Sequence, residues 1–190
     1  LTDRWSVSAL LSYVEHSRKL GHSFFGSTTS SGIGDSVILA RYTPMYLTPF
    51  SRHEVSLGLG VRVPTGEDSY VDDFLVSEDM QPSVGAYGTI IWSSYSYAFD
   101  QAATLRLNTA ANYTFNEEND RNYAFGDEFI FAAGFSQELH ARFAWSAALR
   151  YRSTRVDRRS GYTIPNTGGE WLDFIPTIQL KFYFLTSNHK

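Results

Sequence analysis

The stretch from His53 to Gly66 reads H-E-V-S-L-G-L-G-V-R-V-P-T-G and decides the fold. Apolar side chains recur at every second position, which is the period of a β-strand, because successive side chains point to opposite faces. The apolar face carries Val55, Leu57, Leu59, Val61 and Val63. The other face has charge at its two ends, Glu54 and Arg62, with Gly58 and Gly60 between them. The Pro-Thr-Gly turn then ends the strand.

The same alternation recurs along the chain and predicts about eight strands. Their lengths of roughly 9–13 residues exceed the 5–6 typical of soluble sheets and approach the length of a tilted membrane-spanning strand. We expect strands at residues 5–13, 36–42, 53–63, 83–93, 103–113, 128–135, 142–151 and 172–184. In the fourth of these, the predicted apolar face carries Val84, Ala86, Gly88, Ile90 and Trp92.

The connections between the predicted strands alternate in length. Long polar ones cover residues 16–35, 64–82, 114–127 and 153–171, and shorter ones cover residues 43–52, 94–101 and 136–141. Long extracellular loops that alternate with short periplasmic turns are typical of outer-membrane barrels. This pattern predicts that the N-terminus and the tail at 185–190 are periplasmic.

Composition is compatible with this class. The 190 residues are enough for one domain with a sizeable core, and charged residues make up 19%, below the usual quarter. A net charge of −4 gives no basic footprint for nucleic acid, and the absence of cysteine excludes disulfides and thiolate metal sites. No apolar run approaches the roughly 18 residues of a membrane helix, but closed barrels also span membranes.

A soluble lipocalin-like barrel would show the same alternation with its apolar face turned inward. Charges within the strands lie on the non-apolar face, where a wet lumen accepts them, and the apolar faces carry none. Aromatic residues gather near strand ends, as in the interfacial girdles of membrane barrels: Trp5, Tyr13, Tyr42, Trp92, Tyr95, Tyr97, Phe99, Tyr113, Tyr151, Phe182 and Phe184. We therefore predict an all-β, antiparallel, up-and-down transmembrane β-barrel in the bacterial outer membrane.

In this orientation a set of charged side chains faces the lumen. It consists of Arg41, Glu54, Arg62, Arg106, Glu128, Arg142, Arg150, Asp173 and Lys181. These charges either pair and fill the lumen, or line an electropositive pore for anions or zwitterions. Eight strands favour a filled interior, while a larger barrel leaves both interpretations open. Gly58 and Gly60 either ease curvature or leave open space; filling of that space by neighbours such as Arg106 or Tyr87 would weaken a transport role.

Several short motifs resemble one family of Gram-negative outer-membrane barrels, the family named for transport in the meta-cleavage pathway of phenol degradation. The resembling pieces are L-T-D-R-W at 1–5, G-I-G-D at 32–35, A-R-Y at 40–42, L-G-L-G-V-R-V-P-T-G at 57–66, P-N-T-G-G at 165–169 and F-I-P-T-I at 174–178. The resemblance implies a barrel that moves small, often hydrophobic or aromatic compounds, and it carries over no catalytic or ligand residues. Members tend to be longer, so residues 1–190 are expected to be one barrel domain that lacks flanking strands, within a complete barrel of roughly 10–12 strands.

Other chemistry has weaker support. The histidines show no metal-ligand spacing, so neither a metal nor a cofactor is predicted. The loop at 67–79 carries Glu67, Asp68, Asp72, Asp73, Glu78 and Asp79; it could bind a divalent cation, but a solvated loop is favoured. The last loop places four arginines where they either contact lipopolysaccharide phosphates or remain solvated: Arg152, Arg155, Arg158 and Arg159.

The leading functional prediction is a channel or facilitator for small molecules, and not an enzyme. The alternative is a structural or partner-binding envelope barrel with a filled lumen. A remote alternative is a lipid-modifying enzyme at the rim that uses His22 and Ser23. The expected partners are outer-membrane lipid and lipopolysaccharide, with a small solute, a protein partner or a second copy left open.

Overall fold

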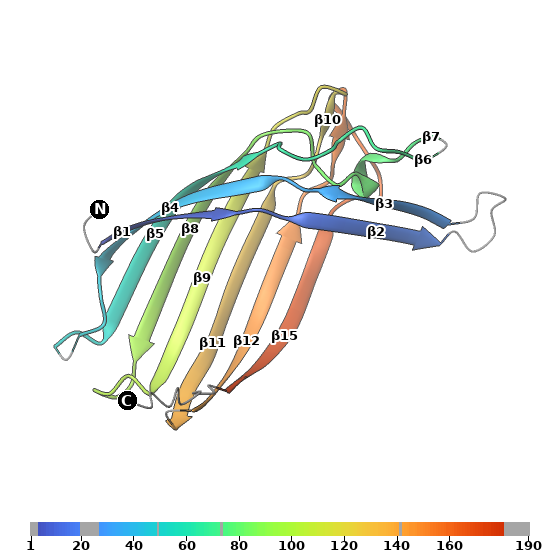
Figure 1. Ribbon diagram of the computed structural model, residues 1–190. Coiled ribbons are helices and arrows are strands. Elements are labelled where there is room, and N and C mark those ends of the chain that lie inside the picture. The colour runs from blue at the N-terminus through green and yellow to red at the C-terminus, as the bar shows by residue number, and fades with distance from the viewer. Residues whose placement is uncertain (1–3, 20–26, 49, 73, 141, 181–190) are drawn as a thin grey trace, which may run out of the picture.

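A computed structural model describes residues 4–19, 27–48, 50–72, 74–140 and 142–180. Eight strands form one antiparallel sheet whose spatial order follows the chain (Figure 1). They are β1 (Trp5–Leu10), β4 (Ser36–Met45), β5 (His53–Val63), β8 (Gly88–Ala98), β9 (Leu105–Asn116), β11 (Glu128–His140), β12 (Phe143–Thr154) and β15 (Gly169–Leu180). The prediction of an all-β, up-and-down antiparallel sheet is confirmed.

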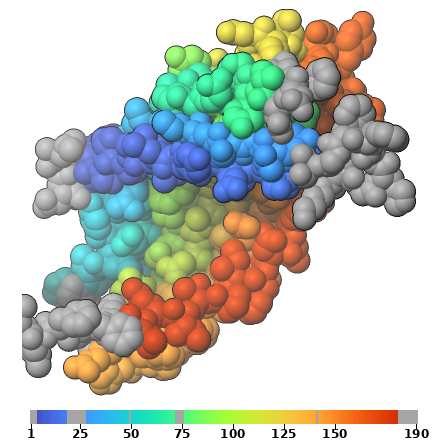
Figure 2. All heavy atoms as spheres, turned by 45° about the vertical axis from the view of Figure 1, so that its right-hand side comes forward, coloured from blue at the N-terminus to red at the C-terminus, as the bar shows by residue number. Residues whose placement is uncertain are grey.

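The sheet curls. Figure 2 shows the N-terminal strands (blue) and β15 (red) on either side of a hollow, with the middle strands behind it. Within the described residues β1 pairs with β4 and β15 with β12, and no pairing joins β1 to β15. The eight strands therefore form a curved sheet with two unpaired edges. The predicted 10–12 strands of a complete barrel remain a prediction.

Smaller elements gather at one end of the sheet, which we call the loop end (Figure 1). They are the hairpin of β2 (Tyr13–Lys19) and β3 (Ser27–Ile33), the pair β6 (Val71–Asp72) and β7 (Phe74–Leu75), the 3-10 helix η1 (Glu78–Met80), and β10 (Tyr123–Ala124), β13 (Arg158–Arg159) and β14 (Tyr162–Thr163). Short connections, described at 46–48, 50–52, 99–104 and 142, lie at the opposite end, the turn end. The predicted alternation of long and short connections is confirmed.

The predicted strand at 53–63 coincides with β5, but the prediction for 83–93 is wrong because β8 runs from Gly88 to Ala98. Residues 83–87 form an irregular turn in which the backbone N–H of Val84 donates to the Asp35 carboxylate at 3.1 Å. Gly85 lies at φ +71°, a left-handed conformation that favours glycine and ends strand geometry. The alternating sequence pattern therefore includes residues 83–87, although long-range contacts hold these residues in a turn.

This shift also corrects the faces of β8. Trp92 lies opposite Gly58 and Ile90 opposite Gly60, so both side chains share a face with the glycines and not with Leu57 and Leu59. A Cβ added to Gly58 would be 3.1 Å from Trp92 Cε3 and 3.3 Å from Leu39 Cδ1. The space that the sequence left open above the glycines is thus occupied by Trp92 and Leu39, and not by Arg106 or Tyr87.

The first part of the chain also differs from expectation. The strand predicted at 5–13 ends at Leu10, and the connection predicted at 16–35 contains most of the β2–β3 hairpin. Several predictions fall outside the described residues: those for His22, Ser23, Asp73, Lys181, Phe182, Phe184 and the tail at 185–190.

Candidate functional site

Cross-strand register gives the sheet two chemically different faces. The face that we call the apolar face carries Val7, Ile38, Leu57, Leu59, Ile91, Tyr113, Phe131, Leu149, Phe174 and Ile178. Leu59 is 62% exposed and Ile178 is 70% exposed. Apolar side chains exposed over a whole sheet face mark a surface that another apolar medium or a partner covers.

The opposite face, which we call the polar face, carries the charged residues that the sequence singled out on strands. Register places on it Arg41, Glu54, Arg62, Arg106, Glu128, Arg150 and Asp173, joined by Asn108, Asn112 and Arg152. Arg142 lies in the turn before β12 and not on a strand, and Lys181 lies outside the described residues. That these side chains line a lumen remains a prediction.

Several of these charges are paired on the face itself. Arg150 Nη2 lies 2.8 Å from Asp173 Oδ2 across β12 and β15. Arg62 Nε lies 3.4 Å from a carboxylate oxygen of Asp35 at the loop end. Such pairs place carboxylates beside the arginines, which favours a mixed-charge surface over a strongly electropositive one.

Arg152 is a correction to the sequence analysis, which placed it in the last loop. It lies within β12, opposite Ile130 and Trp171, and its guanidinium carbon is 4.3 Å from the centroid of the Trp171 ring. A cation at this distance over an indole face is attracted by the ring quadrupole. Arg152 therefore belongs to the polar face.

The middle of the polar face is lined by short side chains. The register runs from Ser56 through Ser94, Ala110 and Ala132 to Arg150. Ala110 and Ala132 extend only a short way above the sheet beside the Arg150–Asp173 pair, whereas Ser56 at the other end of the row is fully buried and shares a hydrogen bond with Thr43. The sequence shows that each of these strands carries a small residue, but only the register shows that these residues lie side by side.

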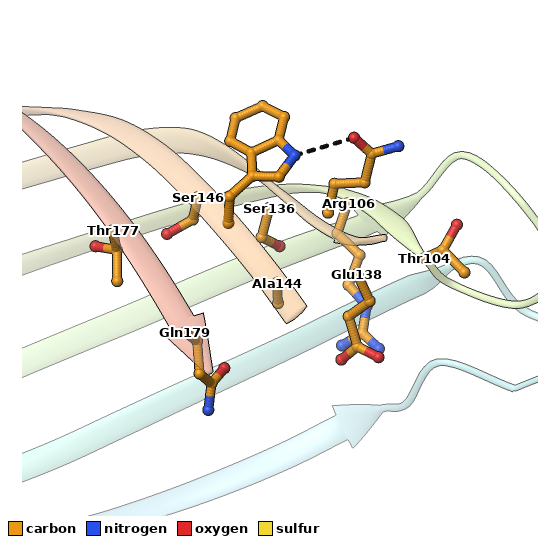
Figure 3. Close-up of a pocket in the computed structure, with 10 residues that line it drawn as sticks. Thr104, Arg106, Ser136, Glu138, Ala144, Ser146, Thr177 and Gln179 are labelled. Carbon is orange, nitrogen blue, oxygen red and sulfur yellow. Dashed lines mark hydrogen bonds between the residues drawn. The ribbon is translucent and has the colours of Figure 1, made fainter. Parts of the chain in front are cut away.

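A pocket lies at the turn end of the same face (Figure 3). It is lined by Thr104, Arg106, Ser136, Gln137, Glu138, Ala144, Trp145, Ser146, Thr177 and Gln179. Arg106 Nε donates to the carbonyl oxygen of Ala103 at 2.7 Å. Trp145 pairs with Ile178 in the register, so the bond from Trp145 Nε1 to Gln137 Oε1 at 3.1 Å lies on the apolar side of the sheet. Sequence analysis placed Arg106 on this face but did not predict a pocket around it.

At the loop end the buried carboxylate of Glu78 organises a polar cluster that the sequence did not predict. Glu78 is 7% exposed and accepts hydrogen bonds from Arg121 Nε and Nη2, each at 2.7 Å. Asn119 Nδ2 donates to it at 3.3 Å, and so does Arg159 Nη2. Arg121 also reaches Asp68 at 3.2 Å. One carboxylate thus joins the connections that follow β5, β9 and β12.

The β2–β3 hairpin joins the same cluster. Arg18 pairs with Asp79, and the hydroxyl of Ser30 donates to the carbonyl oxygen of Met80. The acidic loop is therefore neither simply solvated nor a cation site at these positions: Asp68, Glu78 and Asp79 are neutralised by arginines. Among the described residues, no group of His, Asp or Glu side chains is arranged to hold a metal ion.

Charge pairing also shifts the ionisation of these groups. Burial alone would raise the pKa of Glu78, but the hydrogen bonds and charge of Arg121, with contributions from Asn119 and Arg159, outweigh it and lower the pKa below 4.5. For Asp79, burial likewise raises the pKa, while bonds from Arg18 and Ser77 lower it further, to a net decrease. Both carboxylates are therefore ionised at neutral pH.

We expect the loop cluster to loosen in acid. Because the folded pKa of Glu78 is lower than the ordinary value of 4.5, its contribution to stability is complete above that value and is lost as the pH falls through the lowered pKa. Hydrogen–deuterium exchange of residues 117–127, corrected for the intrinsic rate, should accelerate only below about pH 4.5. A Glu78→Gln variant should lose most of this acid dependence; unchanged acid dependence in that variant would assign the effect to another group.

Comparison with known proteins identifies a family and solved structures of similar fold. A family model described as "Putative MetA-pathway of phenol degradation" matches residues 1–169. The fold is similar to that of the COG4313 outer membrane channel from Pseudomonas putida F1, with a TM-score of 0.74 at 16% sequence identity, over 96% of this chain and 67% of that chain. No curated protein matches the chain. Within the described residues, no helix is long and apolar enough to cross a membrane.

Proposed function

Because the chain belongs to the MetA-pathway phenol-degradation family and has the fold of an outer-membrane channel, we propose that it conducts small molecules across the bacterial outer membrane. Solutes pass along the polar face, and the apolar face meets lipid. The observation that carries the proposal is that the charged side chains of the eight described strands lie on the polar face, with Glu170 at the start of β15 as the exception. A lipid-facing exterior and a polar interior are the two surfaces of a transmembrane barrel.

A conducting lumen needs a closed barrel. Among the described strands, β1 and β15 each have one edge without a partner strand. Such an edge is not tolerated in hydrocarbon because its backbone groups lack hydrogen-bond partners. We propose closure by further strands, to the 10–12 expected of this family. The additional strands would widen the interior beyond the side-chain-filled core of an eight-stranded barrel.

The alternative, a structural barrel with a filled lumen, is favoured by separate observations. Trp92 packs above Gly58, and the pairs Arg150–Asp173 and Arg62–Asp35 take up part of the polar face. The row of small residues through Ala110 and Ala132 favours an open path over a filled one. Transport, and not catalysis, is the function that these surfaces support. On the outer side, exposed Arg158 is proposed to meet lipopolysaccharide phosphate.

Planar-bilayer conductance of the purified protein tests the proposal, with a matched pair of variants on β11. Ala132 lies on the polar face between Ala110 and Arg150, and Ala133 lies on the apolar face between Thr109 and Leu149. Ala132→Trp should reduce the single-channel current several-fold because the indole fills the narrow row. Ala133→Trp should leave the current unchanged because its side chain meets lipid.

Two outcomes would contradict the proposal. A folded wild-type protein that never conducts would favour the structural barrel. Equal effects of the two tryptophan variants on current would mean that the polar face is not the conduction path.

A further inference from the structure

Arg106 and Glu138 lie close together on the polar face at the turn end, on neighbouring strands. Arg106 lies opposite Ser136 in the register of β9 and β11. The backbone N–H of Glu138 donates to the carbonyl oxygen of Thr104 at 2.8 Å. The two residues are therefore diagonal neighbours, whose side chains start roughly 7–8 Å apart. Figure 3 shows both side chains pointing to the same side of the sheet.

These opposite charges do not neutralise each other. Within the part of the chain that the structure describes, neither Arg106 nor Glu138 forms an ion pair, whereas Arg150 and Asp173 on the same face do. Arg106 Nε donates to the carbonyl oxygen of Ala103, and within the described residues its two terminal nitrogens form no hydrogen bond. The pocket is thus lined by a cation and an anion that are not paired with each other.

The wall around the two charges consists of short polar side chains. Thr104, Ser136, Ser146, Thr177 and Gln179 come from four strands or their ends and line an open pocket of about 180 Å³. Asn108 Nδ2 donates to Ser136 Oγ at 2.9 Å, which orients that hydroxyl. Hydroxyl and amide groups can accept or donate, so they suit a polar solute without fixing its charge.

We propose that Arg106 and Glu138 form a binding subsite for small zwitterions that carry a carboxylate and an ammonium group. The inference rests on the proposed channel function and specifies a solute class for it. The carboxylate accepts from the terminal nitrogens of Arg106, and the ammonium donates to Glu138; charge-assisted bonds of this kind are stronger than neutral ones. A simple anion would be repelled by Glu138, and a simple cation would be repelled by Arg106. Each would therefore bind less tightly than a zwitterion.

Calorimetry with three solutes of one carbon skeleton tests the subsite on the full chain in detergent. L-Phenylalanine carries both charges, 3-phenylpropionate only the carboxylate, and phenethylamine only the ammonium. L-Phenylalanine should bind about tenfold more tightly than either of the others, a difference of about 1.4 kcal/mol. Arg106→Gln and Glu138→Gln should each remove most of that advantage, and Glu138→Gln should improve 3-phenylpropionate binding.

Matched controls separate these effects from a general loss of charge. Arg158→Gln and Glu170→Gln change exposed residues away from the pocket and should bind L-phenylalanine like the wild type. Equal binding of all three solutes, no binding by the folded wild type, or unchanged preference in both pocket variants would each overturn the subsite. Because calorimetry needs no current, a protein that conducts but does not select zwitterions refutes only this inference, and one that never conducts refutes the channel.

Discussion

Arginine at position 111 is expected to destabilise the membrane-inserted protein by about 2–4 kcal/mol, whereas arginine at position 110 should cost far less. Ala111 lies on the apolar face between Ser93 and Phe131, and Ala110 lies on the polar face between Ser94 and Ala132. Both positions are near the middle of β9. A charged side chain at the midplane must leave water when it faces lipid but can stay hydrated when it faces a lumen.

Urea titrations of Ala111→Arg and Ala110→Arg in phospholipid vesicles measure this difference directly. The two variants differ only in which of two adjacent alanines is replaced, so propensity and chain position are matched. Equal losses would show that the two faces meet the same environment. A larger loss at position 110 would show that the apolar face is the interior of a soluble barrel.

Removing the Glu78 carboxylate is the second change with a large expected effect. Removing one partner of a buried ion pair typically lowers the free energy of unfolding by about 3–5 kcal/mol, because the remaining charge is left buried without compensation. Glu78 is 7% exposed, and Arg121 gives it two hydrogen bonds. In Glu78→Ala we expect the loop cluster to open locally, with faster hydrogen–deuterium exchange in residues 117–127 and little change in β9 and β11.

The matched control for this prediction is an exposed ion pair of the same loops. Arg155 lies 3.3 Å from Asp127 and its side chain is 67% exposed, so Arg155→Ala should cost about 0–1 kcal/mol. Similar exchange in the two variants would show that Glu78 does not hold the loops together. Faster exchange throughout the sheet in Glu78→Ala would show that the cluster stabilises the barrel as a whole.

Strand periodicity predicted the sheet well where each strand is long and its faces differ in chemistry. The predicted strand at 53–63 coincides with β5, and the polar and apolar residues of β9, β11, β12 and β15 lie on the predicted faces. Side chains alternate between the two faces of a strand, so the face of each residue is still predicted correctly when the predicted end of the strand is wrong by two residues. The alternating loop lengths then predicted the two ends of the sheet.

Prediction failed where long-range contacts override a local pattern. Residues 83–87 alternate like a strand, yet hydrogen bonds from Ser83 and Val84 to Asp35, far away in sequence, hold them in a turn. The faces of Ile90 and Trp92 were exchanged as a consequence. The sequence carries one usable signal for the correct answer, since Gly58 and Gly60 on the opposing strand can accommodate two large neighbours.

The loop cluster was missed for a different reason. The acidic run at 67–79 and the arginines at 121 and 155–159 each look solvated when considered alone. Opposite charge on two long loops at the same end of a sheet predicts that they pair, but the choice of Glu78 as the buried partner depends on three-dimensional packing. No periodic pattern in the sequence encodes that choice.

Cysteine accessibility along β9 tests most directly whether the polar face lines a water-filled lumen. The chain has no cysteine of its own, so single cysteines at positions 108 to 114 can be labelled without background. In lipid vesicles a membrane-impermeant thiol reagent should label positions 108, 110, 112 and 114, and positions 109, 111 and 113 should resist it. Labelling of the odd positions, or protection of both sets, would contradict a lumen on the polar face.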